Sequence, residues 1–397
     1  MRRFWVWAAI LVIGAVLLAG AGGAEPVKLK SLREALAYIE QNRPEELDLG
    51  VTNMGLAELW TIRQELPEGA ALHFTMQLMY SNVSDTDREV NLYFLPSGVT
   101  AEDLEAVLTL FPEAEVVDVS KGIRIRNEVM IRVIEAHPEI RFIWMIQLNK
   151  GHSVCSADTA YSTFNDFYEP YRLTSEELEM LKYAPGLKAL DLGHNSITSL
   201  DFLRFFPDLE FLILGENPKI TDIEMIGTLK HLKYLEMFTV GVSDLSPLAG
   251  CTELVDLNLS NCKHVTDLSP LDGLASLERF WGTMMDGVPD EKKIAFIEQH
   301  PQTRSNFLAQ NPTSDGWREH TRYQHYVWCL ENHTWTSFDQ EPYAFTAGQE
   351  PAVDSAYLEN QKETLRFRIF VSGLLYGADS AGYAAEDADE YGENRDE

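Results

Sequence analysis

A repeat in the second half of the sequence constrains the fold more than any other feature. Four closely aligned segments begin at Leu187, Leu209, Leu232 and Leu254, with spacings of 22, 23 and 22 residues, and a fifth begins at Leu277. A fixed period of this size is typical of stacked solenoids, in which each repeat buries its apolar side chains against its neighbours. The sequence therefore predicts a repeat solenoid rather than a globular domain built around a catalytic core.

Apolar residues recur at the first, fourth and sixth positions of each repeat, as in Leu187, Leu190 and Leu192. The fourth and sixth positions alternate with outward residues, which is the period-two pattern of a short strand with one buried face. Each repeat is therefore expected to contribute one strand to an inner sheet.

The ninth position of the four repeats holds Asn195, Asn217, Val240 and Cys262. A buried Asn at this position can hydrogen-bond to backbone groups of the neighbouring turns and form a ladder along the solenoid. Cys262 is a small, weakly polar substitute in this ladder, whereas Val240 interrupts it. Cys251 falls on an apolar position of the return half, so Cys251 and Cys262 are expected to be buried thiols. The sequence leaves open whether Cys155 and Cys329 form a disulfide.

The same pattern, less regular, extends in both directions. Prolines lie two residues before the first position of several repeats, where they would end the preceding helix. These are Pro67, Pro112, Pro138, Pro185, Pro207 and Pro301. Their spacing predicts strands around Leu72, Val117, Ile143, Leu190, Leu212 and Phe307, with further strands near Leu92 and Phe164. Residues 44–311 would hold about a dozen repeats, whose inner sheet would run for about 55 Å.

Two of the longer repeats carry helix start signals. Thr100 with Asp103, and Thr174 with Glu177, have the spacing of capping boxes, in which each partner's side chain bonds to the other's backbone N–H. These repeats are therefore expected to contain true helices on the outer side of the solenoid.

The segment LKALDLGHNSI at residues 187–197 matches the motif L-x-x-L-x-L-x-x-N-x-I residue for residue. The chain thus resembles the leucine-rich repeat family, and its central repeats resemble the 22-residue class found in exported bacterial internalin-like proteins. The likeness is strong over residues 187–274 and weaker over the rest of 44–311. It implies a curved α/β horseshoe with a parallel sheet on the concave side, and binding of a protein partner through that sheet.

The N-terminus has the features of a targeting segment. Arg2 and Arg3 precede an apolar run, and small residues follow it up to Ala24. This pattern predicts a cleaved signal peptide and a secreted or cell-surface protein with no transmembrane domain after cleavage, although an uncleaved anchor is an alternative. The expected organisation is a signal peptide at 1–24, an N-terminal cap at 25–43, the solenoid at 44–311 (best repeats 187–276), an aromatic C-terminal cap at 312–345, an unassigned segment at 346–376 and an acidic disordered tail at 377–397.

The net charge is −30. An acidic surface repels phosphate backbones, so nucleic acid is excluded as a partner and a protein with basic patches is favoured. The last twelve residues hold seven acidic side chains against Arg395 alone, a composition that cannot bury enough apolar surface to order itself.

Several outward strand positions carry large apolar side chains where solvated strands usually place polar ones. Aromatic side chains with scattered charges are typical of protein interfaces. The residues expected to line a concave binding face are Phe142, Trp144, Asp191, Phe211, Ile213, Tyr234, Glu236, Phe238, Asn258, Arg279 and Trp281. The alternative is that another part of the chain covers them as ordinary core, because the aromatic C-terminal region also needs a surface to pack on. The segment LRFRIFVSGLL from Leu365 fits either a strand or a partner-binding strip.

The leading prediction is a non-enzymatic interaction module with no cofactor and no metal. One alternative is an enzyme: His152 and Cys155 would be a base and a thiol nucleophile, or His325, Cys329 and His333, spaced four residues apart, would hold a metal on one helix face. A further alternative is a surface component that associates with itself through exposed aromatic side chains.

Overall fold

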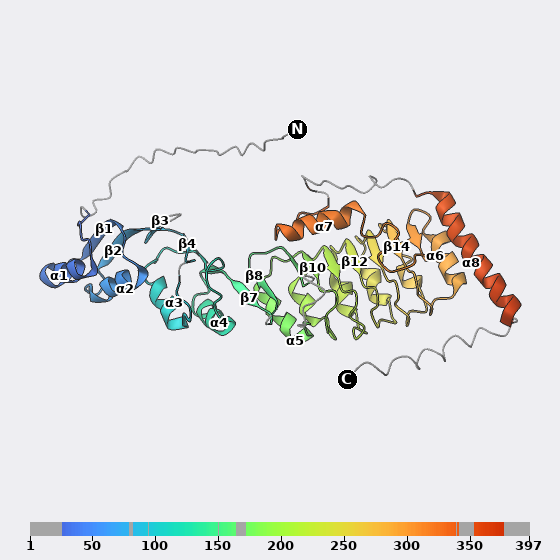
Figure 1. Ribbon diagram of the computed structural model, residues 1–397, viewed down its shortest axis with the longest axis horizontal. Coiled ribbons are helices and arrows are strands. Elements are labelled where there is room, and N and C mark those ends of the chain that lie inside the picture. Colours follow the sequence, from blue (N-terminus) through green and yellow to red (C-terminus); the bar gives the residue numbers. More distant parts are fainter. Residues whose placement is uncertain are drawn as a thin grey trace, which may run out of the picture. The chain divides into compact units, whose positions relative to one another are not determined.

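The computed structural model describes residues 26–78, 82–93, 95–149, 151–163, 172–338, 340 and 353–376 (Figure 1). The chain forms two compact units. Unit 1 is Met1–Asp118 with Val129–Phe142, and unit 2 is Val119–Glu128 with Ile143–Glu397. The predicted signal peptide at 1–24, Phe164 and the acidic tail at 377–397 lie outside the described residues.

The first part of unit 1 alternates helices and strands. Its elements are α1 (Leu32–Asn42), β1 (Glu46–Thr52), α2 (Leu56–Glu65), β2 (Ala71–Gln77) and β3 (Asn82–Ser84). Ser31 caps α1 by accepting the N–H of Glu34, and α1 ends at Arg43 in a left-handed conformation. β1 and β2 are parallel, whereas β3 pairs with β2 in the antiparallel sense. Val27 N–H donates to the carbonyl of Asp48, so the chain before α1 bonds to β1.

The second part of unit 1 holds another small sheet. Its elements are β4 (Glu89–Asn91), α3 (Ala101–Leu108), β5 (Val116–Asp118), α4 (Asn127–Ala136) and β6 (Arg141–Ile143), and the three strands lie in the order β4–β5–β6. The predicted capping box at Thr100 and Asp103 is confirmed: each side chain accepts the other's backbone N–H, and α3 begins at the next residue.

Unit 2 opens with a hairpin that the repeat pattern did not predict. β7 (Met145–Gln147) and β8 (Ser153–Cys155) are antiparallel. Asn149 closes the turn, since its Oδ1 accepts the N–H groups of Gly151 and His152 at 3.0 and 3.1 Å.

The solenoid of unit 2 follows. Seven parallel strands lie side by side in sequence order: β9 (Ala160–Ser162), β10 (Ala189–Asp191), β11 (Phe211–Ile213), β12 (Tyr234–Glu236), β13 (Asp256–Asn258), β14 (Arg279–Trp281) and β15 (Arg304–Asn306). The return segments are α5 (Ser175–Leu178), η1 (Glu179–Tyr183), η2 (Asp201–Phe205), η3 (Glu224–Thr228), η4 (Ser246–Gly250), η5 (Ser269–Leu271) and α6 (Asp290–Gln299), where η denotes a 3₁₀ helix. Thr174 and Glu177 form the predicted capping box of α5.

The strand register follows the sequence repeat. The fourth-position residues Leu190, Leu212, Leu235, Leu257 and Phe280 stand opposite one another across the sheet and are fully buried. The eighth position is left-handed in each of the five repeats, at His194, Glu216, Thr239, Asn261 and Met284. The first four of these residues donate their backbone N–H to a carbonyl of the next repeat, which fixes the turn after each strand.

The ninth-position side chains bridge neighbouring turns. Asn195 Nδ2 donates to the carbonyl of Leu192 at 3.0 Å, and its Oδ1 accepts the N–H of Leu173 at 2.7 Å. Asn217 repeats this arrangement one turn later and donates to the same Leu192 carbonyl at 2.9 Å. Cys262 takes the corresponding place, with Sγ 3.2 Å from the carbonyl oxygen of Met237.

The spacing of the prolines predicts the register of two strands wrongly by one residue. β6 and β15 begin three residues after Pro138 and Pro301, whereas β2, β5, β10 and β11 begin four residues after their prolines. Because side chains alternate between faces, a shift of one residue exchanges the buried set for the outward set. The expected single inner sheet is also divided: in the described part of the chain, its strands lie in the separate groups β1–β2, β4–β6 and β9–β15.

Two further helices complete unit 2 (Figure 1). α8 (Ser355–Tyr376) packs against α6 and β15 at the end of the solenoid, and Gln361 Oε1 accepts the N–H of Phe307 next to the last strand. α7 (Thr321–Glu331) lies along the sheet instead. The expectation that the aromatic segment caps the solenoid end is therefore wrong, because α8 covers that end, and the segment LRFRIFVSGLL is helical.

Candidate binding face and the segment that covers it

The predicted binding residues of unit 2 are buried beneath residues 312–338, which we call the strap. The outward side chains of β9–β14 are at most 6% exposed. Five of them are 0% exposed: Phe211, Tyr234, Glu236, Asn258 and Trp281. We call this outward side of β9–β15 the concave face. The expectation of an exposed face is wrong. The alternative holds instead, because another part of the chain covers the aromatic side chains.

Aromatic packing joins the strap to the concave face. Phe211 is sandwiched between Tyr234 of the next strand and Tyr326 of α7, with ring centroids 4.1 Å away on each side. Trp317 packs against Tyr234 and Trp281 at 5.4 and 5.3 Å. Stacked and tilted rings at these distances add to the free energy gained by burying their area. The face and the strap together form a second hydrophobic core.

A buried ionic cluster holds the middle of the strap. Asp256 Oδ1 accepts Arg279 Nε at 2.8 Å and Arg322 Nη1 at 2.7 Å, and Arg322 also bonds to Glu278. Asp256, Arg279 and Arg322 are at most 2% exposed. Burial acts to raise the pKa of Asp256, but the two guanidinium groups outweigh it and hold that pKa below its ordinary value. The carboxylate is therefore ionised and paired at neutral pH.

Glu236 binds the strap one strand away. Its Oε2 accepts the hydroxyl of Tyr234 at 2.9 Å and the indole N–H of Trp317 at 2.6 Å, and its Oε1 pairs with Arg318. Asp191 accepts the Tyr326 hydroxyl at 3.1 Å and the N–H of Gly193 at 3.0 Å.

Asp191 differs from Asp256 in its partners: the Tyr326 hydroxyl and the Gly193 N–H bond to it, whereas two arginines pair with Asp256. Burial raises the pKa of Asp191, the Gly193 N–H opposes this, and the nearby Glu236 raises it further. The sequence predicted Asp191 at an outward strand position, but it did not show that ionisation of this carboxylate is penalised.

The strap also bonds to the face through uncharged groups. Asn258 Nδ2 donates to the carbonyl of Pro312 at 2.8 Å, and Trp281 Nε1 donates to that of Ser314 at 3.1 Å. Ser337, near the other end, bonds to Glu210 and accepts Lys233 Nζ at 2.8 Å. Contacts therefore run along the whole strap.

The remaining predicted face residues lie elsewhere. Phe142 and Trp144 point into the core, 8% and 2% exposed, because β6 is shifted by one residue relative to the prediction. Trp144 meets the ring of Tyr183 edge-on at 5.9 Å. Phe238 lies beside Gly215, where a Cβ would come within 2.4 Å of its ring, so that glycine makes room for the phenylalanine. Arg318 lies over the same ring.

The outward side of the unit 1 strands is accessible in part. β5 and β6 alternate between buried and accessible residues, and β2 does so along its whole length. The side chains of Glu46 and His73 on β1 and β2 are 38% and 40% exposed, and Glu89 and Arg141 are exposed. We call this outward side of β1, β2, β4, β5 and β6 the open face.

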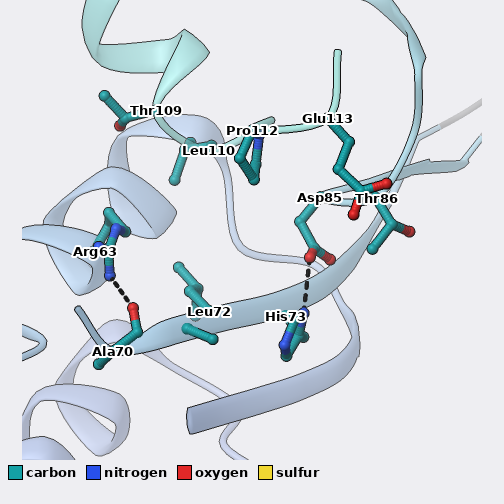
Figure 2. Close-up of a pocket in the computed structure, with 11 residues that line it drawn as sticks. Arg63, Ala70, Leu72, His73, Asp85, Thr86, Thr109, Leu110, Pro112 and Glu113 are labelled. Atoms are coloured by element: carbon teal, nitrogen blue, oxygen red, sulfur yellow. Dashed lines mark hydrogen bonds and ion pairs between the residues drawn. The ribbon is translucent and has the colours of Figure 1, made fainter. Parts of the chain in front are cut away.

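A pocket of about 200 Å³ lies in unit 1, between β2, the residues around Asp85 and the end of α3 (Figure 2). Asp85 is buried; its Oδ2 bonds to His73 Nδ1 and its Oδ1 accepts the N–H of Phe74, both at 2.9 Å. Arg63 donates to the carbonyl of Ala70 at 2.7 Å. These contacts fix the imidazole and the guanidinium at the pocket wall, and the volume is below the usual range of ligand cavities.

A sequence profile described as "Leucine Rich repeats (2 copies)" matches residues 185–231, which form β10, η2, β11 and η3. The matched residues have the strand spacing, the asparagine ladder and the parallel register described above. The chain contains leucine-rich repeats.

Solved structures similar to this leucine-rich repeat protein include internalins. Internalin C2 from Listeria monocytogenes is 23% identical over 42% of this chain and 82% of its own, with a TM-score of 0.28. Internalin F from the same species is 14% identical over 74% and 86%, with a TM-score of 0.31. The leucine-rich repeat domain of APL1B is 18% identical over 29% and 36%, with a TM-score of 0.26. No curated protein sequence matches the chain significantly.

The alternative metal site does not form as the sequence spacing suggested. His333 lies beyond the end of α7, with Nδ1 3.4 Å from Asp158, and so is not on one helix face with His325 and Cys329. Within the described ranges, no group of three or more His, Cys, Asp or Glu side chains is arranged to hold a metal ion. His152 is buried and Cys155 is half-buried at the end of β8.

All four cysteines of the leucine-rich repeat protein fall within the described ranges, and all are free thiols. Burial raises the pKa of Cys251 to about 11 and that of Cys262 to about 12. These two thiols are therefore protonated at neutral pH and act as small apolar core groups. No helix in the described part of the chain is long and apolar enough to span a membrane.

Proposed function

We propose that the chain is an exported, non-enzymatic protein-interaction module whose partner binds the open face of unit 1. The observation that carries the proposal is the difference in accessibility between the two sets of outward strand residues. Outward positions of unit 1 alternate with buried ones and reach solvent, whereas those of unit 2 are covered by the strap. A partner can dock on unit 1 without displacing any described part of the chain.

The chemistry of the open face favours a basic partner. Its acidic side chains include Glu46, Asp48, Glu89 and Asp118, and the chain as a whole carries a net charge of −30. Complementary charges speed the encounter of two proteins and select the partner, while the half-buried side chains between them supply contact area. The signal-like residues 1–24 support export to the cell surface or the medium.

The test compares two charge-reversed proteins with the same net charge. Glu46→Lys with Glu89→Lys changes the open face, and Asp208→Lys with Glu253→Lys changes exposed residues in the turns before β11 and β13 of unit 2. We expect the first pair to reduce capture of the native binding partner by tenfold or more. The second pair should leave capture within about twofold, because exposed charges away from an interface contribute little to binding. Equal capture by both variants would refute binding at the open face.

A further inference from the structure

The strap resembles a bound ligand more than a loop, because it contributes both the apolar and the charged partners of the face. Tyr326 and Trp317 fill the aromatic surface formed by Phe211, Tyr234 and Trp281. Arg318 and Arg322 meet the carboxylates of Glu236 and Asp256. The face therefore selects a segment that presents aromatic and arginine side chains together.

One strap residue makes this complex sensitive to acid. His320 caps the N-terminus of α7, and its Nδ1 accepts the N–H of Arg322 at 3.2 Å. An imidazolium has no acceptor nitrogen, so protonation at Nδ1 would remove this cap. It would also place a positive charge at the positive end of a helix dipole.

The surroundings of His320 add to this effect. Arg279 on β14, Arg304 on β15 and Arg322 on α7 oppose a further positive charge, while Asp256 on β13 favours it but already pairs with two of these arginines. Burial, followed by the charge of Arg279, lowers the pKa of His320 to about 3. Burial against its aromatic neighbours also lowers the pKa of His325 on the same helix, although its bond to the Thr336 carbonyl acts in the opposite direction.

We propose that the concave face of unit 2 is a second interaction surface, specific for a basic aromatic segment, which the strap occupies at neutral pH and leaves more readily under mildly acidic conditions. The proposal does not depend on binding at the open face of unit 1. The strap follows β15 and precedes α8, so its release is local and leaves the solenoid folded. An incoming segment must compete with a tethered one, which neutral pH makes difficult and acid makes easier.

The sign of the effect follows from proton linkage. The released strap binds a proton at His320 near the ordinary pKa of 6.5, whereas the closed strap does so only near 3. Closure is therefore strongest above pH 6.5, and the ratio of open to closed forms rises by up to about tenfold for each pH unit between these values. Asp191 acts in the opposite sense, since its raised pKa favours closure once it is protonated.

The first experiment measures hydrogen exchange of the full chain between pH 6.5 and 4.5, corrected for intrinsic rates. For amides of α7 in the wild type, we expect the opening constant to rise by about fiftyfold over these two pH units. His320→Asn keeps a cap acceptor without a titrating group, so its α7 amides should change little. α6 should stay protected in both. The acid release would be overturned if the opening constant of the wild-type α7 amides did not change with pH, if α6 changed equally, or if the change persisted in His320→Asn.

The second experiment identifies what the vacated face binds, using a labelled synthetic peptide of residues 314–338 that carries His320→Asn. We expect this peptide to bind the wild-type chain at least tenfold more tightly at pH 5.0 than at pH 7.5, and to show no such gain with the His320→Asn chain. Adding Arg318→Glu and Arg322→Glu to the peptide should abolish binding. Acid release without peptide binding, or equal binding of both peptides, would overturn the assigned partner class.

Discussion

Unit 1 and unit 2 use similar strands but expose them differently. In β5 the outward residues Val116 and Asp118 are partly accessible, whereas in β12 the outward residues Tyr234 and Glu236 are fully buried. The strap causes this difference, because it covers the strands of unit 2. A repeat pattern thus determines which side of a strand faces the core, while the other side depends on what the rest of the chain places there.

The two faces also differ in composition. The outward residues of β11, Phe211 and Ile213, are large and apolar, and those of β2 include Ala71 and Thr75. A set of aromatic side chains in water carries a free-energy cost that packing removes. The strap supplies matching aromatic side chains, so the covered face behaves as a second core and the open face as a surface.

The largest contrast is expected from two tryptophan substitutions. Trp317→Ala removes a fully buried ring of the strap and should lower the free energy of unfolding by about 3–5 kcal/mol. Trp60→Ala in α2 of unit 1 removes a ring that is 38% exposed and should cost about 1 kcal/mol or less. Urea unfolding at pH 7 compares the two, and equal losses would contradict a strap that forms part of the core.

Breaking a buried ion pair and breaking an exposed one should also change the free energy of unfolding by different amounts. Arg322→Ala leaves Asp256 and Glu278 short of a partner in a buried site, which should cost about 3–5 kcal/mol. Arg204→Ala removes an exposed pair with Glu179 and should cost about 1 kcal/mol or less. If thermal or urea unfolding finds the two changes equivalent, the cluster beneath the strap is solvated rather than buried.

A smaller but more discriminating contrast involves two aspartates of the covered face. The pKa of Asp256 is lower in the folded protein than in the unfolded chain. The ionised carboxylate therefore stabilises the fold above the unfolded-state pKa, and this stabilisation is lost as the pH falls through the folded-state pKa. Asp256→Asn should therefore destabilise the protein at pH 7 by about 1–3 kcal/mol. Asp191 has a raised pKa, so its ionised form costs stability at neutral pH, and Asp191→Asn should be neutral or stabilising there.

Urea midpoints at pH 7 and pH 4 test this pair of aspartates. The benefit of Asp191→Asn should shrink as the pH falls toward the ordinary pKa of 3.8, because the wild-type side chain then becomes protonated too. Destabilisation of similar size by both substitutions at pH 7 would show that Asp191 is held as an ionised partner of Tyr326 and Gly193.

Much of the solenoid could be predicted from the sequence, because its local signals agree with one another. The leucine spacing placed Leu190, Leu212, Leu235 and Leu257 in the core, and the capping boxes at Thr100 and Thr174 placed two helix starts. Each of these signals involves residues that are close to one another in both the sequence and the structure.

The errors arose where one residue or one long-range contact decides the outcome. The strand after Pro138 begins one residue earlier than its counterparts, which moved Phe142 and Trp144 from the expected face into the core. The position of the strap depends on contacts such as Tyr326 with Asp191, 135 residues apart in the sequence. Aromatic outward residues and an aromatic C-terminal segment were both visible, but spacing alone could not pair them.

The most direct test of the covered face is hydroxyl-radical footprinting of the folded chain at pH 7.5, with tryptophan oxidation measured residue by residue. Trp60 in unit 1 is the internal reference, because its side chain is partly exposed, while Trp281 of the concave face and Trp317 of the strap are fully buried. We predict oxidation of Trp281 and Trp317 at least tenfold slower than that of Trp60. Comparable rates at the three positions would contradict a strap that occupies the concave face.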